Sequence, residues 1–92
     1  MKKVIIAQLS IKNSNLSDFL NSADVMTKKS LEEDGCTAYT IYKSLANKNE
    51  FLIYENYQDE ESVELHNSSD HFKNFLSSVM PFLVKEPVIE LF

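Results

Sequence analysis

The chain has 92 residues, enough for one domain over residues 1–92. Its nine basic residues are all lysines and face 14 acidic ones, so the net charge of −5 argues against a nucleic-acid partner. The only glycine, Gly35, excludes a dinucleotide fingerprint or a phosphate loop, because both need several glycines to let the backbone approach phosphate groups.

The cysteine count and the hydropathy pattern bear on location. The single cysteine, Cys36, cannot form an intrachain disulfide, which agrees with a reducing compartment, and we expect a cytoplasmic protein. The N-terminal run MKKVIIAQLSIKN begins as a signal peptide does, but Gln8 and Ser10 interrupt it and no small-residue cleavage site follows. No segment has the length of a membrane span, so we expect no membrane partner.

The first predicted elements are a strand and a helix. Residues 3–12 are β-branched and apolar with later alternation, which predicts a strand. Apolar residues at helical spacing over 16–26 predict a helix, with Asn15 or Ser17 suited to cap its start. We expect Gly35 to end this helix in the left-handed cap conformation.

Two further strands follow. Residues 36–44 and 50–58 are rich in aromatic and β-branched residues, and the short Asn-containing turn between them predicts an antiparallel hairpin. Strict alternation places Cys36 and Tyr39 on opposite faces of the first of these strands.

The C-terminal third predicts a broken helix and a last strand. Acidic residues begin a helix over 59–67, and the Ser-Ser-Asp run at 68–70 breaks and recaps it. Apolar residues at helical spacing over 72–83 predict the next helix, which Pro81 ends or kinks. Residues 86–92 predict an edge strand, since a proline lies near its start.

The resulting order, β-α-β-β-α-β, predicts a ferredoxin-like α+β sandwich with an antiparallel sheet. Helices would cover one sheet face and leave the other bare. Because 43% of the residues are hydrophobic, including six Phe and four Tyr, the bare face should be apolar enough to need covering. We therefore expect a homodimer that packs sheet to sheet.

The two histidines, His66 and His71, are five positions apart. On one unbroken helix their rings would diverge by roughly 140° at 3.6 residues per turn, although the break between them could change that. Two ligands are too few for a metal site, and Cys36 lies far away along the chain, so we predict no metal. Cys36 itself is read as a small buried residue and not as a nucleophile.

Acid–base chemistry is the other possible role of the histidines. His66 follows Val63 on the same helix face, so it should lean toward the core, where an imidazole can move a proton near neutral pH. The spacing alone gives better support to a helix C-terminal role, in which His66 meets free carbonyl groups. For His71 a capping or surface role is favoured more strongly still.

Aromatic and polar strand residues are the remaining candidates. Four aromatic residues could line a pocket for an aromatic substrate, although such a stripe more often forms plain core: Tyr39, Tyr54, Phe72 and Phe75. Asn56 shares a strand face with Tyr54, and Gln8 lies in the first strand. If that face lines a cavity, these residues could donate hydrogen bonds to a substrate oxygen; if it faces a partner, they belong to the interface.

Four motifs follow one another along the chain: the E-x-G-C turn from Glu33 to Cys36, the Tyr54-Glu55 pair with aromatic Tyr57, the acidic run 59–61, and the His-x4-His-Phe segment ending at Phe72. With these motifs in this order, the sequence resembles the antibiotic biosynthesis monooxygenase family over nearly the whole chain. The resemblance implies dimeric α/β barrels of ferredoxin-like subunits, in agreement with the predicted fold.

The resemblance also implies a choice of chemistries. One branch oxidises quinols or polyketide phenols with oxygen and without metal or flavin, and there His66 would be the base and Asn56 or Tyr54 the orienting groups. A haem-degrading branch fits poorly, because it uses a tryptophan and this chain has none. A third branch processes phosphorylated autoinducer-2; it has a first-helix histidine near the position of Thr27 here, and arginine is absent from this chain.

We therefore predict a cofactor-independent monooxygenase that oxidises a small aromatic or quinol-type substrate with O2. The catalytic residues would be His66, Asn56 and Tyr54, and the substrate-binding residues would be His71, Phe72, Phe75 and Tyr39. The alternatives are an isomerase for a small phosphorylated signal and a non-enzymatic module that binds a small ligand.

Overall fold

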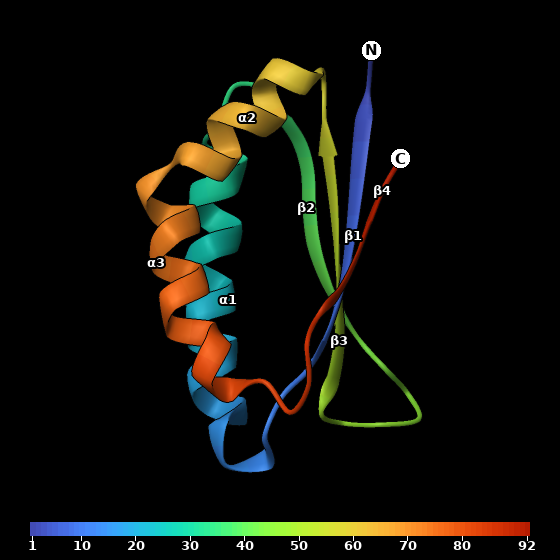
Figure 1. Cartoon of the computed structure of the whole chain (residues 1–92), viewed down its shortest axis with the longest axis vertical. Helices are drawn as coiled ribbons and strands as arrows, with labels where there is room; N and C mark the ends of the chain where they lie inside the picture. Colours follow the sequence, from blue (N-terminus) through green and yellow to red (C-terminus); the bar gives the residue numbers. More distant parts are fainter.

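The computed structural model describes residues 1–92. Its elements occur in the order β1 (Lys3–Ser10), η1 (Asn13–Asn15), α1 (Leu16–Leu31), β2 (Cys36–Lys43), β3 (Glu50–Tyr57), α2 (Glu60–Ser68), α3 (Asp70–Val79), η2 (Met80–Phe82) and β4 (Val88–Leu91). The predicted β-α-β-β-α-β order is confirmed, with the second helix divided into α2 and α3 (Figure 1).

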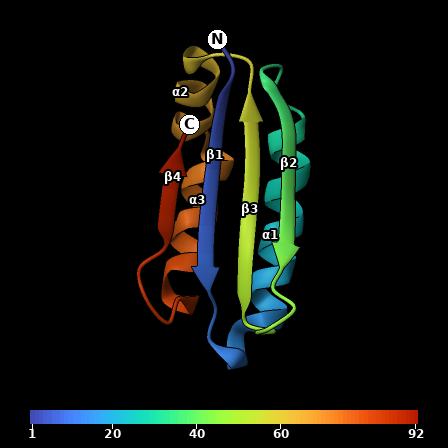
Figure 2. The same cartoon turned by 90° about the vertical axis from the view of Figure 1, so that its right-hand side faces the viewer.

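The four strands form one antiparallel sheet in the order β2-β3-β1-β4. This is the predicted ferredoxin-like α+β fold, and β4 is the edge strand that the proline at its start indicated. Helices α1 and α3 lie side by side on one face of the sheet, and the other face is uncovered (Figures 1 and 2). No helix combines the length and the apolar character needed to cross a membrane.

The core lies between the sheet and the helices. On β1 and β3, alternate residues face the helices and are buried, as period-2 alternation requires: Ile5, Ala7, Leu9, Phe51, Ile53, Glu55 and Tyr57. From α1, Phe19 packs its ring on Phe51 with 4.8 Å between the centroids. One member of this buried set, Glu55, is a carboxylic acid, which marks the part of the core where the site lies.

The start of β2 departs from simple alternation. The pairing of β2 with β3 shifts between Cys36 and Ala38, which is the register change of a β-bulge. The extra residue turns both Cys36 and Tyr39 toward the helices, where they are 7% and 4% exposed. The prediction that these two side chains lie on opposite faces is therefore wrong, because it assumed an unbroken strand.

Gly35 has a packing role and not the predicted capping role. No residue of the chain has a positive φ, and the C-cap of α1 is Glu32 in right-handed conformation. A Cβ atom added to Gly35 would overlap the hydroxyl and Cβ of Ser62, in the first turn of α2. Gly35 therefore allows α2 to approach the turn that leads into β2.

Capping differs between the helices. Neither Asn15 nor Ser17 caps α1 through its side chain, because η1 runs directly into the helix and supplies backbone partners. The predicted recapping at 68–70 is confirmed, since Ser69 accepts from the backbone N–H of Phe72. Asp59, in the predicted acidic start of α2, accepts from the backbone N–H of Ser62 and so caps that helix. Ser69 has extended backbone angles, so it separates α2 from α3.

Candidate functional site

A cluster of two histidines and a glutamate joins three segments of the chain. Oε2 of Glu33, in the turn after α1, lies 2.9 Å from Nδ1 of His66 on α2 and 2.5 Å from Nε2 of His71 on α3. The ring centroids of the histidines are 5.9 Å apart. The rings do not diverge as they would on one unbroken helix, because the predicted break redirects the chain at Ser69 and brings His71 back to the same carboxylate.

The hydrogen bonds of the cluster indicate which ring nitrogens carry a proton. An ionised carboxylate only accepts hydrogen bonds, so each histidine must donate the N–H that faces Glu33. His66 then carries its proton on Nδ1 and keeps a free lone pair on Nε2. His71 donates to the same oxygen from Nε2.

The second nitrogen of His66 faces another carboxyl group. Nε2 of His66 lies 3.7 Å from Oε1 of Glu55, too far for a hydrogen bond, and the hydroxyl of Tyr57 donates to the same oxygen at 2.8 Å. Burial raises the pKa of Glu55 to about 7, and the Tyr57 hydrogen bond opposes that rise. A carboxyl group that stays protonated up to neutral pH is an unusual core residue.

His66 itself is 1% exposed. Burial lowers its pKa below the usual value, and the hydrogen bond that His66 donates to Glu33 opposes that change without reversing it. Although His66 and Glu33 lie within ion-pair distance, we therefore treat His66 as a neutral imidazole at neutral pH. A neutral imidazole with a free lone pair can accept a proton, which is what a general base needs.

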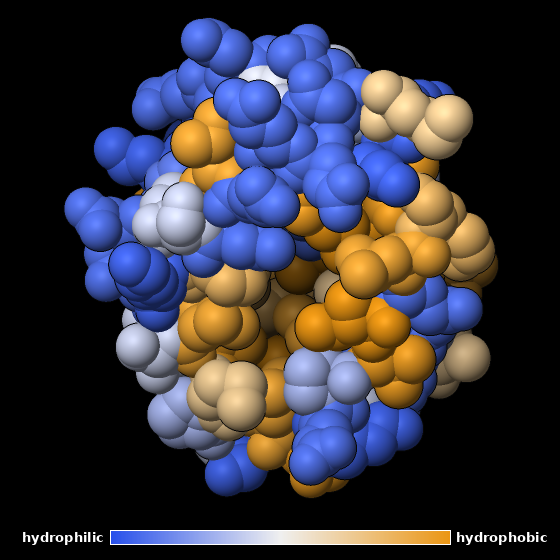
Figure 3. Space-filling view, turned by 45° about the horizontal axis from the view of Figure 1, so that its top comes forward, coloured by the Kyte–Doolittle hydropathy of each residue, from blue (hydrophilic) through white to orange (hydrophobic).

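An apolar cavity of about 430 Å³ opens beside His66 and Glu55. Fourteen of its eighteen lining residues are hydrophobic, and they come mainly from β1, α3 and β4. In the space-filling view, hydrophobic side chains surround a hollow in the surface (Figure 3). A cavity of this volume and lining suits a small, largely apolar molecule that presents one polar group to His66.

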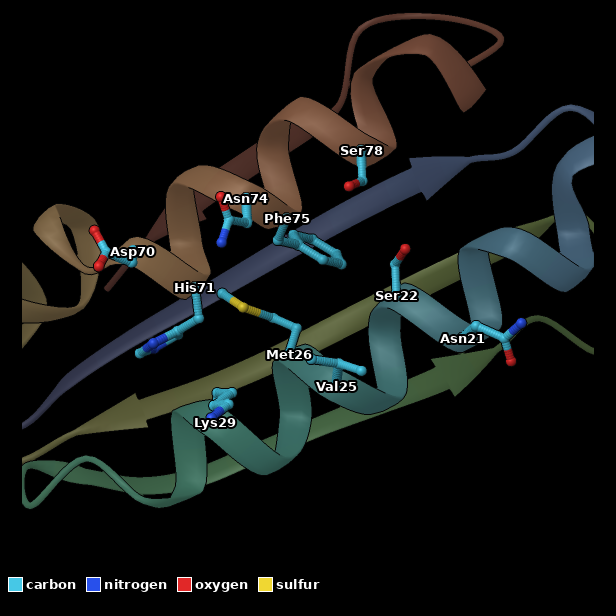
Figure 4. A pocket seen from close by; sticks show the side chains of 10 residues that line it. All are labelled: Asn21, Ser22, Val25, Met26, Lys29, Asp70, His71, Asn74, Phe75 and Ser78. Atoms are coloured by element: carbon cyan, nitrogen blue, oxygen red, sulfur yellow. The ribbon is translucent and has the colours of Figure 1, made fainter.

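A second, more polar cavity of about 520 Å³ runs between α1 and α3. We call it the groove, and its lining residues are Asn21, Ser22, Val25, Met26, Lys29, Asp70, His71, Asn74, Phe75 and Ser78. At one end of the groove His71 lies across from Lys29 (Figure 4). His66 lines the apolar cavity and not the groove, whereas His71 lines the groove and not the cavity.

The predicted site residues divide into three groups. Four of them line the apolar cavity: His66, Phe72, Phe75 and Tyr39. His71 does not line it; its ring contacts Glu33, which in turn contacts His66. Tyr54 and Asn56 point to the uncovered face of the sheet, away from the helices, and they contact each other there through a 3.4 Å hydrogen bond. The structure therefore does not bring Tyr54 and Asn56 to His66 within one chain.

Three further residues belong to the site, although the sequence analysis found them only in motifs that resemble the family and gave them no role: Glu33, Glu55 and Tyr57. For Glu55 a signal existed, since an acid alternates with Phe51 and Ile53 on the buried face of a strand. Cys36 is a protonated thiol in the core, because burial and nearby Glu33 raise its pKa to about 11. This agrees with its reading as a structural residue.

The Glu33, His66 and His71 side chains are also those that could share a metal ion, since their donor atoms lie within 4.8 Å of one another. Ligand atoms at about 2.0–2.1 Å from a tetrahedral zinc ion lie about 3.3 Å from each other. Glu33 is closer than this to both histidines, at 2.9 and 2.5 Å. As they stand, these two distances are those of hydrogen bonds.

Comparisons with known proteins agree with this architecture. Residues 4–77 match the family model "Antibiotic biosynthesis monooxygenase". A Bacillus subtilis protein named "Putative monooxygenase YcnE" is 27% identical over 74 residues, which cover 80% of this chain and 78% of that protein.

Two solved structures share the fold. A conserved protein from Methanosarcina mazei is 28% identical with a TM-score of 0.96, over 100% of this chain and 91% of that one. A "Putative antibiotic biosynthesis monooxygenase" from Nitrosomonas europaea is 19% identical with a TM-score of 0.95, over 99% of this chain and 88% of that one. Because the family model covers most of the sequence, the chain belongs to the antibiotic biosynthesis monooxygenase family.

Proposed function

We propose that this protein is a cofactor-independent monooxygenase that oxidises a small aromatic or quinol-type substrate with O2. The observation that carries the proposal is the free Nε2 of a buried, neutral His66 at the wall of an apolar cavity. Membership of the family supports a monooxygenase-like role.

In the proposed reaction, the substrate hydroxyl gives its proton to Nε2 of His66. The resulting oxyanion is rich in electrons, and in an apolar cavity it is poorly solvated, so its ring carbon can pass electrons to O2. One oxygen atom bonds to that carbon and the other leaves as water. The substrate supplies all four electrons that reduce O2 and both hydrogens of that water, including the proton held on His66, and it leaves as the hydroxylated quinone. The protein's tasks are to hold the proton, to orient the ring and to exclude water.

The cavity residues fit those tasks. Phe72 and Phe75 from α3 and Tyr39 from β2 provide flat apolar surfaces against which an aromatic ring can pack. Phe72 also packs edge-on against His66, with ring centroids 5.2 Å apart, which restricts the imidazole to one orientation. His71 does not touch the substrate in this proposal; it is connected to His66 only through the carboxylate of Glu33.

The uncovered sheet face supports the proposed homodimer. Residues at its centre, including Ile6 and Tyr54, are only half-buried in the single chain, and they lie opposite each other across β1 and β3. Oδ1 of Asn56 is inaccessible to solvent and has no hydrogen-bond partner in the chain. We assign Tyr54 and Asn56 to contacts with a second copy of the chain because both lie on the uncovered face of the sheet.

The phosphorylated-signal alternative has less support. No lysine lines the apolar cavity, and the chain has no arginine, so a bound phosphate would lack a cationic partner there.

The single domain over residues 1–92 and a cytoplasmic location remain part of the proposal. The free thiol of Cys36 agrees with a reducing compartment.

The test is oxygen uptake by chelator-treated protein with a menadiol-like quinol. We compare wild type with His66→Gln, and with Leu65→Ala as a matched control on the exposed side of the same helix. Uptake above the autoxidation blank that falls by about 100-fold in His66→Gln, and stays unchanged in Leu65→Ala, supports the proposal.

Each other result has its own meaning. Oxygen uptake that survives in His66→Gln supports the oxygenase activity and shows that His66 is not its base. Quinol binding without uptake above the blank contradicts the oxygenase and points to a ligand-binding module.

A further inference from the structure

Three donor atoms from three separate segments of the chain meet at one point. Oε2 of Glu33 lies 2.9 Å from Nδ1 of His66 and 2.5 Å from Nε2 of His71, and the three atoms lie within 4.8 Å of one another. Two imidazole nitrogens and one carboxylate oxygen are a ligand set that zinc ions take in proteins, with water in the fourth position. The sequence alone did not specify the third ligand, because Glu33 is 33 residues away from His66.

We propose that Glu33, His66 and His71 bind one Zn²⁺ ion, and that the bound ion prevents His66 from acting as a base. The ion is an inhibitor in this inference and not a cofactor, so the proposed oxygenase reaction stays free of metal. The inhibition rests on the proposed function, whereas the metal site itself does not.

A buried oxygen atom of Glu33 supports a ligand at this position. Oε1 of Glu33 is inaccessible to solvent and has no hydrogen-bond partner, whereas Oε2 accepts from both histidines. A buried carboxylate oxygen without a partner is costly, and a bound ion is one of the explanations for such an atom. A zinc ion between the two rings can contact both oxygens of the carboxylate, which gives Oε1 the partner that the histidines do not provide.

Small movements convert the hydrogen bonds into coordination distances. Tetrahedral zinc ligands lie about 3.3 Å from each other, so Oε2 of Glu33 must withdraw by about 0.4 Å from His66 and about 0.8 Å from His71. His66 is held in place, since the rings of Tyr57 and Phe72 each lie 5.2 Å from it. The side chains of Glu33 and His71 are 17% and 21% exposed, so they have room to move, and water can reach the ion from their side.

The second nitrogen of His66 already faces a carboxyl group. A histidine that binds a metal ion through one nitrogen usually donates the N–H of the other to a carboxylate, a carbonyl group or water. Nε2 of His66 lies 3.7 Å from Oε1 of Glu55, a little beyond hydrogen-bond distance. Glu55 is therefore the acceptor toward which this nitrogen points when the ion occupies Nδ1.

Zinc binding determines which nitrogen of each ring carries a proton. Nδ1 of His66 must lose its hydrogen to bind the ion, and the ring then carries its one proton on Nε2. In His71 the proton moves from Nε2 to Nδ1. A ring that starts neutral only moves its proton, and a ring that starts charged releases one, so the inference needs no particular charge at rest. Nε2 of His66 then has no free lone pair and cannot accept a proton from a substrate.

The position of the ion favours inhibition over oxygen activation. An iron centre that activates oxygen through two histidines and one carboxylate needs open positions that its substrate can reach. Neither Glu33 nor His71 lines the apolar cavity, so an ion held between them does not meet a substrate there. Imidazole ligands suit zinc, and zinc has no redox chemistry of its own.

The first test is NMR of tag-free, chelator-treated wild type labelled with ¹⁵N-histidine, whose spectrum contains only two rings. The protonated nitrogen of each ring is identified before and after addition of Zn²⁺. We expect the proton of His66 to move from Nδ1 to Nε2 and that of His71 to move from Nε2 to Nδ1. A His66 ring that keeps its proton on Nδ1 in excess zinc overturns the inference. This measurement needs no variant, so it does not depend on the folding of one.

Calorimetry with Zn²⁺ then tests the carboxylate ligand. Glu33→Gln should weaken zinc binding by at least about 100-fold, since even the loss of a group that only supports a ligand costs about 10–100-fold. Glu32→Gln is the matched control, because it removes the same charge from the exposed neighbouring residue. We expect Glu32→Gln to bind zinc as wild type does; equal affinity in Glu33→Gln and wild type overturns the site.

Oxygen uptake, measured against a zinc-containing autoxidation blank, separates this inference from the proposed function. Zinc should lower kcat for the quinol by about 100-fold with little change in KM, because the ion blocks the base and not the cavity, and chelator should restore kcat. Uptake that persists while His66 binds zinc overturns the inhibition.

The two proposals can fail separately. If zinc moves the ring proton of His66 but the zinc-free protein takes up no oxygen, the proposed function fails and the metal site stands. If the zinc-free protein takes up oxygen and zinc leaves both ring protons in place, the metal site fails and the proposed function stands.

Discussion

The buried carboxyl group of Glu55 should make the protein less stable as the pH rises. Its pKa of about 7 in the folded protein compares with an ordinary value of 4.5, because burial disfavours the charged form. A carboxyl whose folded pKa is raised stabilises the fold at low pH, where it is protonated in both states. That contribution is lost as the pH increases from 4.5 to about 7.

The size of the effect follows from that difference. At about 1.4 kcal/mol per pH unit, the change from 4.5 to about 7 corresponds to a loss of about 3 kcal/mol in the free energy of unfolding. Glu55→Gln removes the ionisation and keeps an oxygen that accepts the hydrogen bond from Tyr57. The variant should therefore be close to wild type at pH 4.5 and about 3 kcal/mol more stable than wild type at pH 9.

The assay is urea unfolding followed by circular dichroism at several pH values from 4.5 to 9, with both proteins at one fixed concentration because a dimer would make stability concentration-dependent. His66 acts in the opposite direction, since its lowered pKa makes stability rise with pH. Subtracting the wild-type curve from the variant curve removes that shared contribution. A difference that is constant across the pH range would refute the reasoning.

Three further predictions concern other parts of the chain. Gly35→Ala should lower the free energy of unfolding by about 1–3 kcal/mol in urea unfolding, because the added Cβ meets Ser62; Asp34→Ala, at an exposed neighbour, should not. Oxygen uptake should fall as the pH decreases below the ordinary pKa of histidine, because the lowered pKa of His66 keeps the ring neutral until then and only the neutral ring accepts a proton; uptake that increases on acidification would contradict this. Ile6→Glu, on the uncovered sheet face, should give a folded monomer by sedimentation, and a wild-type monomer would remove the proposed dimer.

Local patterns predicted the elements well because each pattern has a local cause. The acidic start of α2 and the serine before α3 cap their helices through side chains within three residues, so the sequence contains both partners of each bond. Alternation placed Phe51, Ile53, Glu55 and Tyr57 on one face of β3, as the structure shows. The bulge at the start of β2 depends on pairing with β3, and alternation within β2 could not reveal it.

The site was harder to predict because its contacts are distant in sequence. His66 and Glu33 are 33 residues apart, and His71 and Glu33 are 38 residues apart. The predicted break at 68–70 left the relative direction of the two histidine rings open, because the distance between them depends on the backbone of Ser69. The sequence did contain one unused sign of the site, an acid at a core position of β3, since an unpaired carboxyl is rarely buried without a function.

A single turn of four residues, Glu33 to Cys36, explains why the cluster forms where it does. Glu33 provides the carboxylate, and its backbone carbonyl accepts from the N–H of Cys36, which begins β2. Gly35 leaves room for Ser62, and its carbonyl accepts from Gln58, just before α2. The turn therefore fixes the start of α2 and holds the group that its histidine must meet. A change at Gly35 should disturb His66 as well as stability, whereas a change at Glu33 should alter the charge of His66 and leave α2 in place.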